Sequence, residues 1–430
     1  MLHFTALELT LLLLLAAVIG VVGFRLLQLP PMLGYLAVGI LIGPHAFGLV
    51  PESEGTRYLA EFGVVFLMFS IGLEFNLNKL RSMRELVFGL GLLQVVLTIV
   101  VALLAVLGVS WALGAAFQGL LQIGWRGAIA LGGALAMSST AIVMKLLSER
   151  LELDAPHGRV IAGVLLFQDL AVVPLLVLIP ALAAPADADL LITLGVALFK
   201  GAVLVGVLLW GGPRVMRSWL TVVARRKSEE LFVLNLLLVT LGMAWLTERA
   251  GLSLALGAFL AGMLIAETEY KHQVETDIRP FHDVLLGLFF ITIGMKLDVQ
   301  PVLDQWPLIL LLSVGPLLAK GLLVTGLAWT LGASAGVAVR TGLYLAQAGE
   351  FGFVLLSLSA EHGLIAPQWL SPVLAAMVLS MLATPFIVQY SDRLVLQVVA
   401  NEWMLQSVQL TKIATRAIRS QSHVIICGYG

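Results

Sequence analysis

Charged residues are scarce in this chain. Only 12% of its 430 residues are Asp, Glu, Lys or Arg, and 60% are hydrophobic, whereas soluble domains carry roughly 25% charged residues. The mean hydropathy is +1.02. This composition excludes a soluble globular protein and predicts a membrane protein.

Cysteine is almost absent, since Cys427 is the only one. A single cysteine excludes a disulfide framework and a Cys-based metal cluster. The chain also lacks a nucleophile and a base within a recognisable motif, so we do not expect an enzyme. The net charge of −1 gives no indication of partners, and no nucleic acid is expected among them.

Long apolar runs are what the chain does have. We count thirteen of them between the N-terminus and about Tyr390, and about 20 apolar residues are enough to cross a bilayer as a helix. The first run, residues 7–24, lacks the basic region and cleavage site of a signal peptide, so it is expected to be retained. The predicted fold is an all-α polytopic membrane protein with about thirteen transmembrane helices.

Lysine and arginine are divided unevenly between the loops. The even-numbered loops carry only Arg57, Arg126, Arg249 and Lys296, whereas the odd-numbered loops carry many more basic residues, among them Arg81, Arg150 and Arg226. Because cytoplasmic loops are enriched in basic residues, the N-terminus is predicted outside and the C-terminus in the cytoplasm of a bacterial inner membrane.

Two stretches of sequence recur in nearly one register. LGYLAVGILIG, which starts at Leu33, resembles LGAFLAGMLIA, which starts at Leu256. SIGLEFN at Ser70 likewise resembles TIGMKLD at Thr292. The paired runs are seven crossings apart, so the halves point in opposite directions through the membrane. Such an inverted repeat is typical of transporters with a midplane binding site; the alternative is that Gly-rich helices look alike by chance.

Few charged side chains lie inside the apolar runs. Asp169 lies twelve residues beyond His157, which at about 1.5 Å per residue places it roughly 18 Å along its helix, near the midplane. Lys320 and Glu350 are similarly deep in later runs. A charge there costs at least ~2.5 kcal/mol, so each needs a partner or a function. Asp169 is expected to be functional, whereas Lys320 and Glu350 form either a buried ion pair or partners of broken-helix ends.

Polar and glycine-rich stretches interrupt two runs in corresponding positions. ALAMSSTAIV carries Ser138, Ser139 and Thr140, and Gly132 and Gly133 before them are expected to loosen the turn. YLAQAGEFGF interrupts the run seven spans later. Two discontinuous crossing helices are therefore predicted, whose unwound carbonyls coordinate a cation. For the hydroxyls of Ser139 and Thr140 the alternative is bonding back to carbonyls of their own helix.

These motifs together carry a resemblance. FQD, SSTAI, GAFLAGMLIAETEYKH, LLGLFFITIGMKLD and QAGEF, in this order and spacing, resemble the Kef-type potassium/proton antiporters of the cation:proton antiporter-2 superfamily. The likeness covers essentially the whole chain. It implies a sodium/proton-antiporter-like fold and a homodimer in which a core domain moves against a dimerisation domain. The small-residue run LGAFLAG also favours a dimer, because small residues let membrane helices approach closely.

The resemblance implies a site for a monovalent cation and a proton. Gln168 and Asp169 resemble the glutamine–aspartate pair of the family's ion site, and Ser139 and Thr140 lie at the same depth. Burial favours the protonated carboxyl and a bound cation favours the carboxylate, so Asp169 is expected to hold one or the other. With an amide beside it at Gln168, one titrating acid predicts one-for-one, electroneutral exchange, unless Lys320 or Glu350 also changes protonation.

Further residues are assigned by the same resemblance. Lys320 resembles the core lysine of the family, and Glu350 is a second supporting charge. The segment HQVETD, with His272, Glu275 and Asp277, resembles the acidic regulatory loop that restrains Kef activity. Substituting either acid is expected to raise basal transport in the longer protein.

Three regions are predicted along the chain. Residues 1–390 form the exchange domain, 391–420 a cytoplasmic linker helix, and 421–430 the start of a dinucleotide-binding-like regulatory domain. SHVIICGYG supplies its first strand and opening glycines. We expect the chain to be a fragment without a nucleotide site. Nucleotide and glutathione effects are expected only through the absent domain, and no cofactor within the chain itself.

The function expected is secondary exchange of K⁺ for protons by alternating access, with lipid and a possible cytoplasmic regulatory subunit as partners. Potassium rests on the resemblance alone, since a carboxylate, hydroxyls and carbonyls suit Na⁺ equally. A Na⁺/H⁺ antiporter, a gated K⁺ channel-like efflux protein and a non-transporting membrane sensor are the alternatives. No filter-like repeat favours the channel.

Overall fold

The structure is a computed structural model that describes residues 6–26, 30–50, 54–75, 77–113, 123–184 and 190–398. These residues form helices and connecting turns without any β-strand. The helices of the first half are α1 (Ala6–Leu26), α2 (Pro31–Ile42), α3 (Glu54–Glu74), α4 (Leu77–Ser82), the π-helix η1 (Leu86–Gly91), α5 (Leu92–Leu113), α6 (Trp125–Ala136), α7 (Thr140–Glu149) and α8 (Pro156–Leu182). Those of the second half are α9 (Leu190–Ala224), α10 (Glu229–Arg249), α11 (Leu254–Ala266), α12 (Lys271–Met295), α13 (Val299–Asp304), α14 (Trp306–Thr330), α15 (Ala335–Leu345), α16 (Glu350–Glu361) and α17 (Pro367–Val398).

The predicted all-helical membrane fold is confirmed. Among the described residues, seven helices are long and apolar enough to cross a membrane, or eight if α15 and α16 count as one bent span. Shorter apolar helices and α3 account for the other runs, so each of the thirteen predicted runs corresponds to a helix or a helix pair. The chain is therefore a multi-pass membrane protein.

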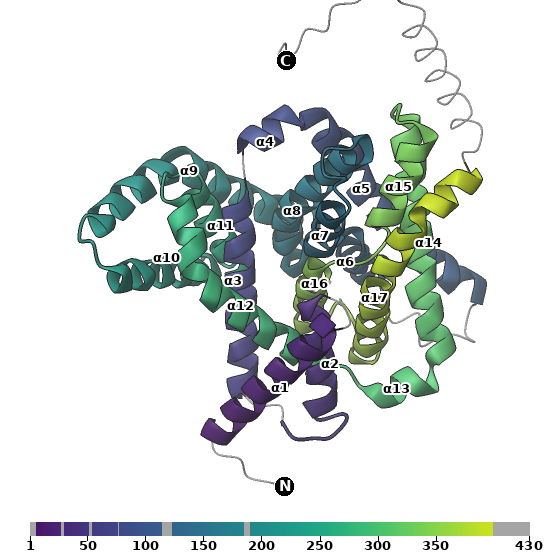
Figure 1. Cartoon of the computed structure of the whole chain (residues 1–430), viewed down its shortest axis with the longest axis horizontal. Helices are drawn as coiled ribbons and strands as arrows, with labels where there is room; N and C mark the ends of the chain where they lie inside the picture. The colour runs from purple at the N-terminus through teal and green to yellow at the C-terminus, as the bar shows by residue number, and fades with distance from the viewer. Residues whose placement is uncertain are drawn as a thin grey trace, which may run out of the picture.

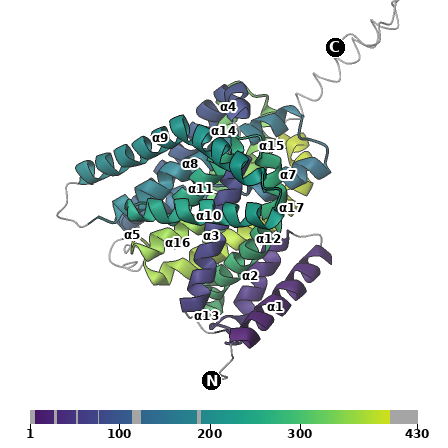
Figure 2. The same ribbon diagram turned by 90° about the vertical axis from the view of Figure 1, so that its left-hand side faces the viewer.

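The helices pack as two bundles. We name α1–α3 with α10–α12 the panel bundle and α5–α8 with α14–α17 the crossing bundle, because packing contacts are concentrated within each set. In Figure 1 α9 and α10 extend to the left, away from α14 and α17 on the right, with α3, α11 and α12 between them. Figure 2 looks onto the side where α3, α10 and α11 lie. The boundary between the two bundles is where a transport pathway is expected.

Two predicted spans are broken near their middles, as expected. Residues 137–139 separate α6 from α7, and the backbone there is extended, with ψ of 139° at Met137 and 108° at Ser139. Residues 346–349 separate α15 from α16, whose axes bend by 48°. Both breaks lie in the crossing bundle, and each leaves a helix C-terminus and a helix N-terminus inside the protein.

The glycines before the first break do not loosen it. Gly132 and Gly133 lie within α6, so that prediction is wrong. Their missing side chains allow close packing instead, because a Cβ on Gly132 would lie 2.8 Å from Ile99 Cα in α5, and one on Gly133 would lie 3.0 Å from the side chain of Leu175 in α8. These glycines hold α6 between its neighbours.

The inverted repeat places equivalent glycines of the two halves against backbone carbonyls of the opposite half. A Cβ on Gly39 of α2 would overlap Ile291 O of α12. A Cβ on the corresponding glycine of the second half, Gly262 of α11, would overlap Phe69 O of α3. Ile291 and Phe69 each directly precede the matched TIG and SIG stretches. The same contact therefore occurs twice, with the halves exchanged.

A second pair of contacts follows the same rule. Gly72 of α3 lies against Phe259 O of α11, and Gly294 of α12 lies against Leu36 O of α2, each too close for a Cβ to fit between them. The two glycines are the third residues of SIGLEFN and TIGMKLD. The two carbonyls belong to the fourth residues of LGAFLAGMLIA and LGYLAVGILIG. Four backbone contacts related by the repeat lock the panel bundle together.

Gly262→Ala is expected to destabilise the protein, because the new methyl group would overlap a backbone carbonyl that cannot move freely. Overpacking of this kind costs typically about 1–3 kcal/mol or more. Gly242→Ala in α10 is the matched control, since a Cβ there meets nothing within 4 Å. Thermal unfolding in detergent should show a clearly lower midpoint for Gly262→Ala and an equal or higher one for Gly242→Ala. Equal midpoints for Gly262→Ala and the unsubstituted protein would contradict the packing described.

The small-residue run of α11 does not face outward. The residues from Ala255 to Ile265 are all buried against neighbouring helices of the same chain, and Gly257 lies against Met243 O of α10. The prediction that this run supports a dimer contact is therefore wrong. The small residues serve close packing within the panel bundle.

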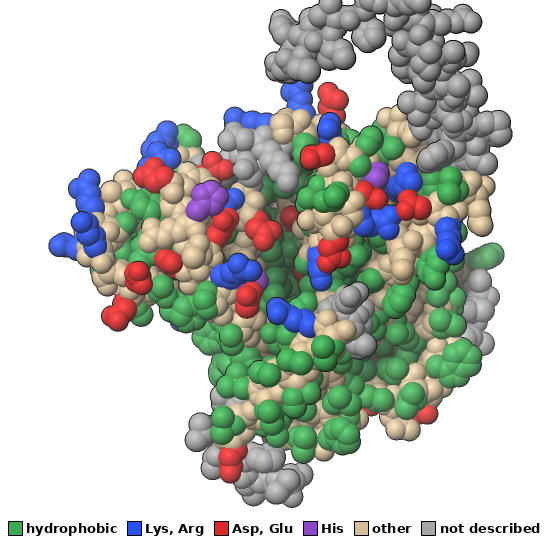
Figure 3. Space-filling model, viewed as in Figure 1, with side chains coloured by type: hydrophobic (Ala, Val, Ile, Leu, Met, Phe, Trp, Pro, Cys, Tyr) green, Lys and Arg blue, Asp and Glu red, His purple; other side chains and the backbone are tan. Residues whose placement is uncertain are grey.

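The two ends of the molecule differ in polarity. Figure 3 shows charged side chains gathered over the upper part of the face drawn, whereas the lower part is mostly hydrophobic. The last helix, α17, ends in the upper part in Figure 1. It continues to Val398, so residues 391–398 of the predicted linker belong to this helix. The rest of the linker and the predicted start of the regulatory domain, residues 399–430, lie outside the described residues.

Candidate functional site

Lys320 of α14 holds the two helix breaks together. Its ammonium donates hydrogen bonds to Met137 O at 2.8 Å and to Gln347 O at 3.0 Å, one carbonyl from each break. The hydroxyl of Ser138 adds a bond to Leu345 O at 2.9 Å. The side chain of Lys320 is only 4% exposed. Helix C-termini carry partial negative charge and unpaired carbonyls, so a buried cation is the partner that both ends require.

Glu350 occupies the opposite pole of the crossing. It is the first residue of α16, and its carboxyl group lies near the start of α7, close to Ser139 and Ala141. Helix N-termini favour a negative charge. Lys320 and Glu350 do not form an ion pair with each other in the described part of the chain. Of the two alternatives that the sequence left open, the structure shows partners of broken-helix ends.

Asp169 lies beside the start of α7. The Thr140 hydroxyl donates to Asp169 Oδ1 at 3.3 Å, and the Asp169 side chain is partly exposed. The hydroxyl of Ser139 caps α7 by accepting from the Ile142 N–H at 3.2 Å. Within the described residues neither hydroxyl donates to a carbonyl of its own helix, and the Thr140 hydroxyl donates to an acidic side chain instead.

Gln168, the neighbour of Asp169, faces the other way. Its Oε1 accepts from the Ser138 N–H at 2.7 Å, and its Nε2 donates to Gln94 Oε1 at 2.8 Å. Gln94 in turn donates to Ala136 O at 3.0 Å. Both amide atoms of Gln168 are thus occupied in a fully buried chain of hydrogen bonds. This chain fixes the unwound segment between α6 and α7 against α5.

A cavity of about 440 Å³ connects these groups to the space between the bundles. The crossing bundle contributes Thr140, Asp169 and Glu350 to its wall, and the panel bundle contributes Ser70 and Glu74. Figure 3 shows the surface hollowed between the two bundles, with acidic side chains near the edge of the hollow. Neither Gln168 nor Ser139 is among the lining residues. Of the four residues predicted to hold the ion, the structure therefore brings Asp169 and Thr140 to the cavity.

An aromatic contact lies beside the cavity. Phe290 of α12 lines the cavity and packs edge-to-face on Phe353 of α16, with ring centroids 6.0 Å apart. Phe289 extends this cluster, and Phe353 is fully buried. The contact joins the panel bundle to the crossing bundle one turn beyond Glu350.

The predicted regulatory loop is helical. His272, Glu275 and Asp277 lie in the first turns of α12, so the prediction of a loop is wrong. The segment carries no glycine or proline before Pro280, and Lys271 and His272 pair with Glu275 at 3.7 and 3.2 Å, spacings that stabilise a helix.

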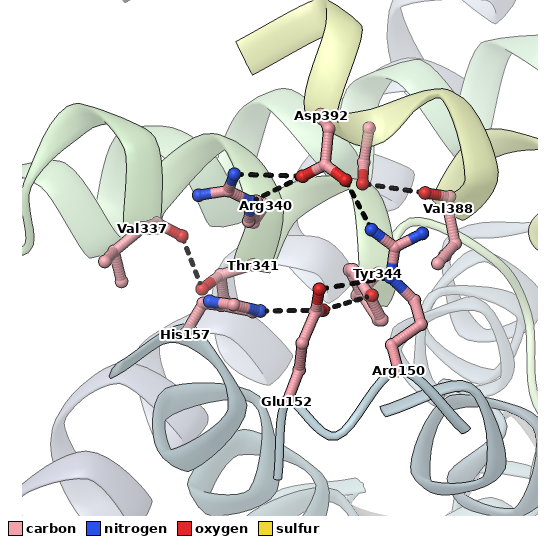
Figure 4. A network of polar contacts seen from close by, with 10 residues as sticks. Arg150, Glu152, His157, Val337, Arg340, Thr341, Tyr344, Val388 and Asp392 are labelled. Carbon is pink, nitrogen blue, oxygen red and sulfur yellow. Dashed lines mark hydrogen bonds and ion pairs between the residues drawn. The ribbon is translucent and has the colours of Figure 1, made fainter. Parts of the chain in front are cut away.

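A polar network at the α7–α8 connection escaped sequence reasoning. Glu152 accepts from Arg150 Nε at 3.1 Å and from the Tyr344 hydroxyl at 2.8 Å, and it contacts His157 Nε2 at 3.0 Å. Arg150 also bonds Asp392 of α17, which Figure 4 shows between Arg150 and Arg340. The network joins α8, α15 and α17 at one end of the crossing bundle. Its members are up to 242 positions apart along the chain, so no local motif announces it.

The stability of this network should depend on pH. Burial raises the pKa of Glu152, but hydrogen bonds from His157, Tyr344 and Arg150 outweigh it and leave the pKa below its usual range. A lowered folded-state pKa stabilises the fold above the unfolded-state value of about 4.3, and this stabilisation is lost as pH falls through the folded-state pKa. Unfolding midpoints in detergent should therefore separate the original protein from Glu152→Gln near neutral pH and converge in acid. Glu149→Gln, an exposed neighbour, is the control; a constant separation at all pH values would contradict this assignment.

The architecture defines the class of protein. Two bundles with an inverted repeat, broken helices and a cavity that reaches a mid-helix carboxylate are the features of secondary transporters. Residues 11–390 match the family model described as "Sodium/hydrogen exchanger, transmembrane". The chain belongs to the sodium/hydrogen exchanger family, which confirms the predicted resemblance to cation:proton antiporters and the prediction that it is not an enzyme.

Relatives and a solved structure agree with this family. The chain is 43% identical over 432 residues to K(+) efflux antiporter 2, chloroplastic, of Arabidopsis thaliana, covering 97% of this chain and 35% of that protein. It is 39% identical over 412 residues to the putative K(+) efflux antiporter KefB of Alkalimonas amylolytica, covering 95% of this chain and 60% of that protein. The chain thus spans about a third to three fifths of the length of these relatives.

The fold is shared with the sodium proton antiporter MjNhaP1 from Methanocaldococcus jannaschii. The TM-score is 0.63 over 90% of this chain and 97% of that one, at 16% sequence identity. At this identity the likeness concerns the fold alone.

Within the described residues, no group of three or more His, Cys, Asp or Glu side chains is arranged to hold a metal ion.

Proposed function

We propose that the chain exchanges a monovalent cation, K⁺, for protons by alternating access, with Asp169 as the site that both ions share. The observation that carries the proposal is the position of Asp169 on a cavity between the two bundles, beside the N-terminus of α7. A cation on this carboxylate disfavours protonation of the same oxygens, and protonation removes the charge that binds the cation. Loading one ion therefore releases the other.

Alternating access follows from the two bundles. The panel bundle is held by four backbone contacts at glycines, and the crossing bundle by Lys320 and the Gln168 chain. Motion between them would open the Phe290–Phe353 contact and close the present cavity, which is the rocking of one body against another about a fixed site. The amide of Gln168 carries no charge, so one acid titrates and the exchange is one cation for one proton.

Potassium is favoured over sodium by the named relatives, which are K(+) efflux antiporters. Proteoliposomes that contain the chain and a pH-sensitive dye test this choice. An imposed K⁺ or Rb⁺ gradient should drive proton movement faster than the same gradient of Na⁺ or Li⁺. Faster exchange with Na⁺ than with K⁺ would identify Na⁺ as the substrate. If none of the four cation gradients drove proton movement, the proposal would be rejected.

A channel is the competing function. It would pass K⁺ without a pH difference and without moving protons, whereas the exchanger moves the two together. Exchange should also be unaffected by a membrane voltage imposed with a permeant anion if it is electroneutral. A voltage-dependent rate would show that more charge moves than one cation against one proton.

The same proposal covers the membrane in which the chain lies, its orientation and its partners. We place the chain in a bacterial inner membrane with the C-terminus in the cytoplasm, where the basic loops lie, and we expect a homodimer. His272, Glu275 and Asp277 at the start of α12 would then face the cytoplasm and a regulatory domain or subunit. Through that domain, nucleotide and glutathione would act.

A further inference from the structure

The carboxyl group of Glu350 lies at the N-terminus of α16, near Ser139 and Ala141 at the start of α7. One of its oxygens, Oε2, is buried and has no hydrogen-bond partner among the described residues. The side chain is 7% exposed and lines the same cavity as Asp169. A buried carboxyl oxygen is thus held at the cavity without a partner from the described part of the protein.

An unpaired buried oxygen of this kind is costly. Leaving a polar atom without a partner costs about 1–3 kcal/mol, and more for a charged group. Lys320 does not supply the partner, because its ammonium donates to the carbonyls of Met137 and Gln347. The missing partner must therefore come from the cavity.

The cavity places Glu350 beside the proposed ion site. Thr140 donates to Asp169, while Ser139 and Ala141, the residues on either side of Thr140, contact Glu350. The two carboxylates therefore flank the same turn of α7. Potassium gives up water only where several protein oxygens replace it, and two carboxylates with a hydroxyl between them provide such a set.

From this geometry we infer that Glu350 Oε2 is a second ligand of the transported cation. The inference rests on the proposed function and extends it, because Asp169 exchanges the proton for the cation while Glu350 contributes a fixed oxygen. Since the carboxyl group is buried at the N-terminus of α16, it has little freedom to adjust. Glu350 then contributes to the choice among cations of different size.

Glu350→Gln separates ligation from helix capping. The amide keeps the shape of the carboxyl group and one oxygen acceptor at the N-terminus of α16. It removes the negative charge that would bind the cation and replaces one of the two oxygens with an NH₂ group. Glu361→Gln at the exposed far end of the same helix is the matched control.

The measurement is the KM for K⁺, Rb⁺ and Na⁺ in proton exchange with proteoliposomes. Glu350→Gln should raise the KM for K⁺ about tenfold or more, the effect of about 1.4 kcal/mol, and should change the ratio of the three KM values. The maximal rate at saturating cation should fall less than the KM rises. The midpoint of thermal unfolding should gain less from added KCl than in the original protein. Glu361→Gln should behave as the original protein in each respect.

Unchanged KM values in Glu350→Gln would overturn the inference, and so would an equal rise for all three cations, because a distant charge acts on every cation alike. If Glu350→Gln does not fold, Glu350→Asp keeps the charge but withdraws it from the cavity, and an unaltered KM ratio in that variant would equally overturn it. These outcomes leave the proposed function intact. The proposed function is tested separately, by the cation gradients in proteoliposomes and by the effect of Asp169→Asn on exchange.

Discussion

Asp169→Asn will abolish coupled exchange while leaving the protein folded. The amide has the shape of the carboxyl and can still accept the Thr140 hydrogen bond, but it neither titrates nor attracts a cation. Proton movement driven by a K⁺ gradient should fall to that of empty liposomes. Gel filtration and the thermal unfolding midpoint should stay near those of the original protein.

The matched control is Asp304→Asn, which makes the same change at an exposed position outside the cavity. It should retain full exchange. Cation-dependent proton movement by a well-folded Asp169→Asn protein would refute the assignment of the shared site. Loss of exchange in both variants would show that the assay responds to something other than the carboxylate.

Lys320→Met is expected to cause the largest loss of stability. The substitution removes the donor of two buried carbonyls, Met137 O and Gln347 O, and each unpaired group costs about 1–3 kcal/mol. Both helix C-termini also lose their compensating charge. The unfolding midpoint in detergent should fall markedly, and exchange should be lost with it.

Two further variants sharpen this test. Lys320→Gln keeps an NH₂ donor, so its midpoint should lie between those of Lys320→Met and the original protein. Lys200→Met removes a lysine from an exposed position on α9 and should leave the midpoint unchanged. If Lys320→Met unfolded at the original temperature, the bonds between the breaks would contribute nothing to stability.

The residues of the site could be predicted largely because the bilayer makes charges rare. Asp169, Lys320 and Glu350 stood out as charged side chains at one depth, and the structure gathers all three around the helix breaks. The repeat was visible because its glycines must sit at matched positions for backbones to touch. Hydrophobic run lengths likewise gave the order of the helices.

The predictions that were wrong concerned the direction in which a side chain points, not its depth in the membrane. A sequence gives the height of Gln168 in the membrane but not the face it occupies, and its amide bonds toward α5 instead of the cavity. A carboxylate there could not donate to Gln94, so Gln168→Asp breaks a support of the α6–α7 break. The outward position assumed for the α11 small-residue run failed for the same reason, since small residues favour close packing without indicating the partner.

The role of the glycines before the first break was also beyond the pattern. Glycines are frequent both where helices unwind and where they touch, and Gly132 proved to be of the second kind. The network of Arg150, Glu152 and Asp392 joins segments that only the fold brings together. Long-range polar contacts of this type leave no periodic trace in a sequence.

The most direct test of the shared site is proton release on cation binding. Adding KCl to the purified protein in weakly buffered detergent solution should release about one proton for each cation bound, because binding and protonation compete for one carboxylate. A pH indicator measures the protons, and calorimetry in buffers of different ionisation enthalpy counts them per binding event. Release that disappears in Asp169→Asn is the predicted result. Cation binding without proton release in the original protein, or undiminished release in Asp169→Asn, would contradict the account.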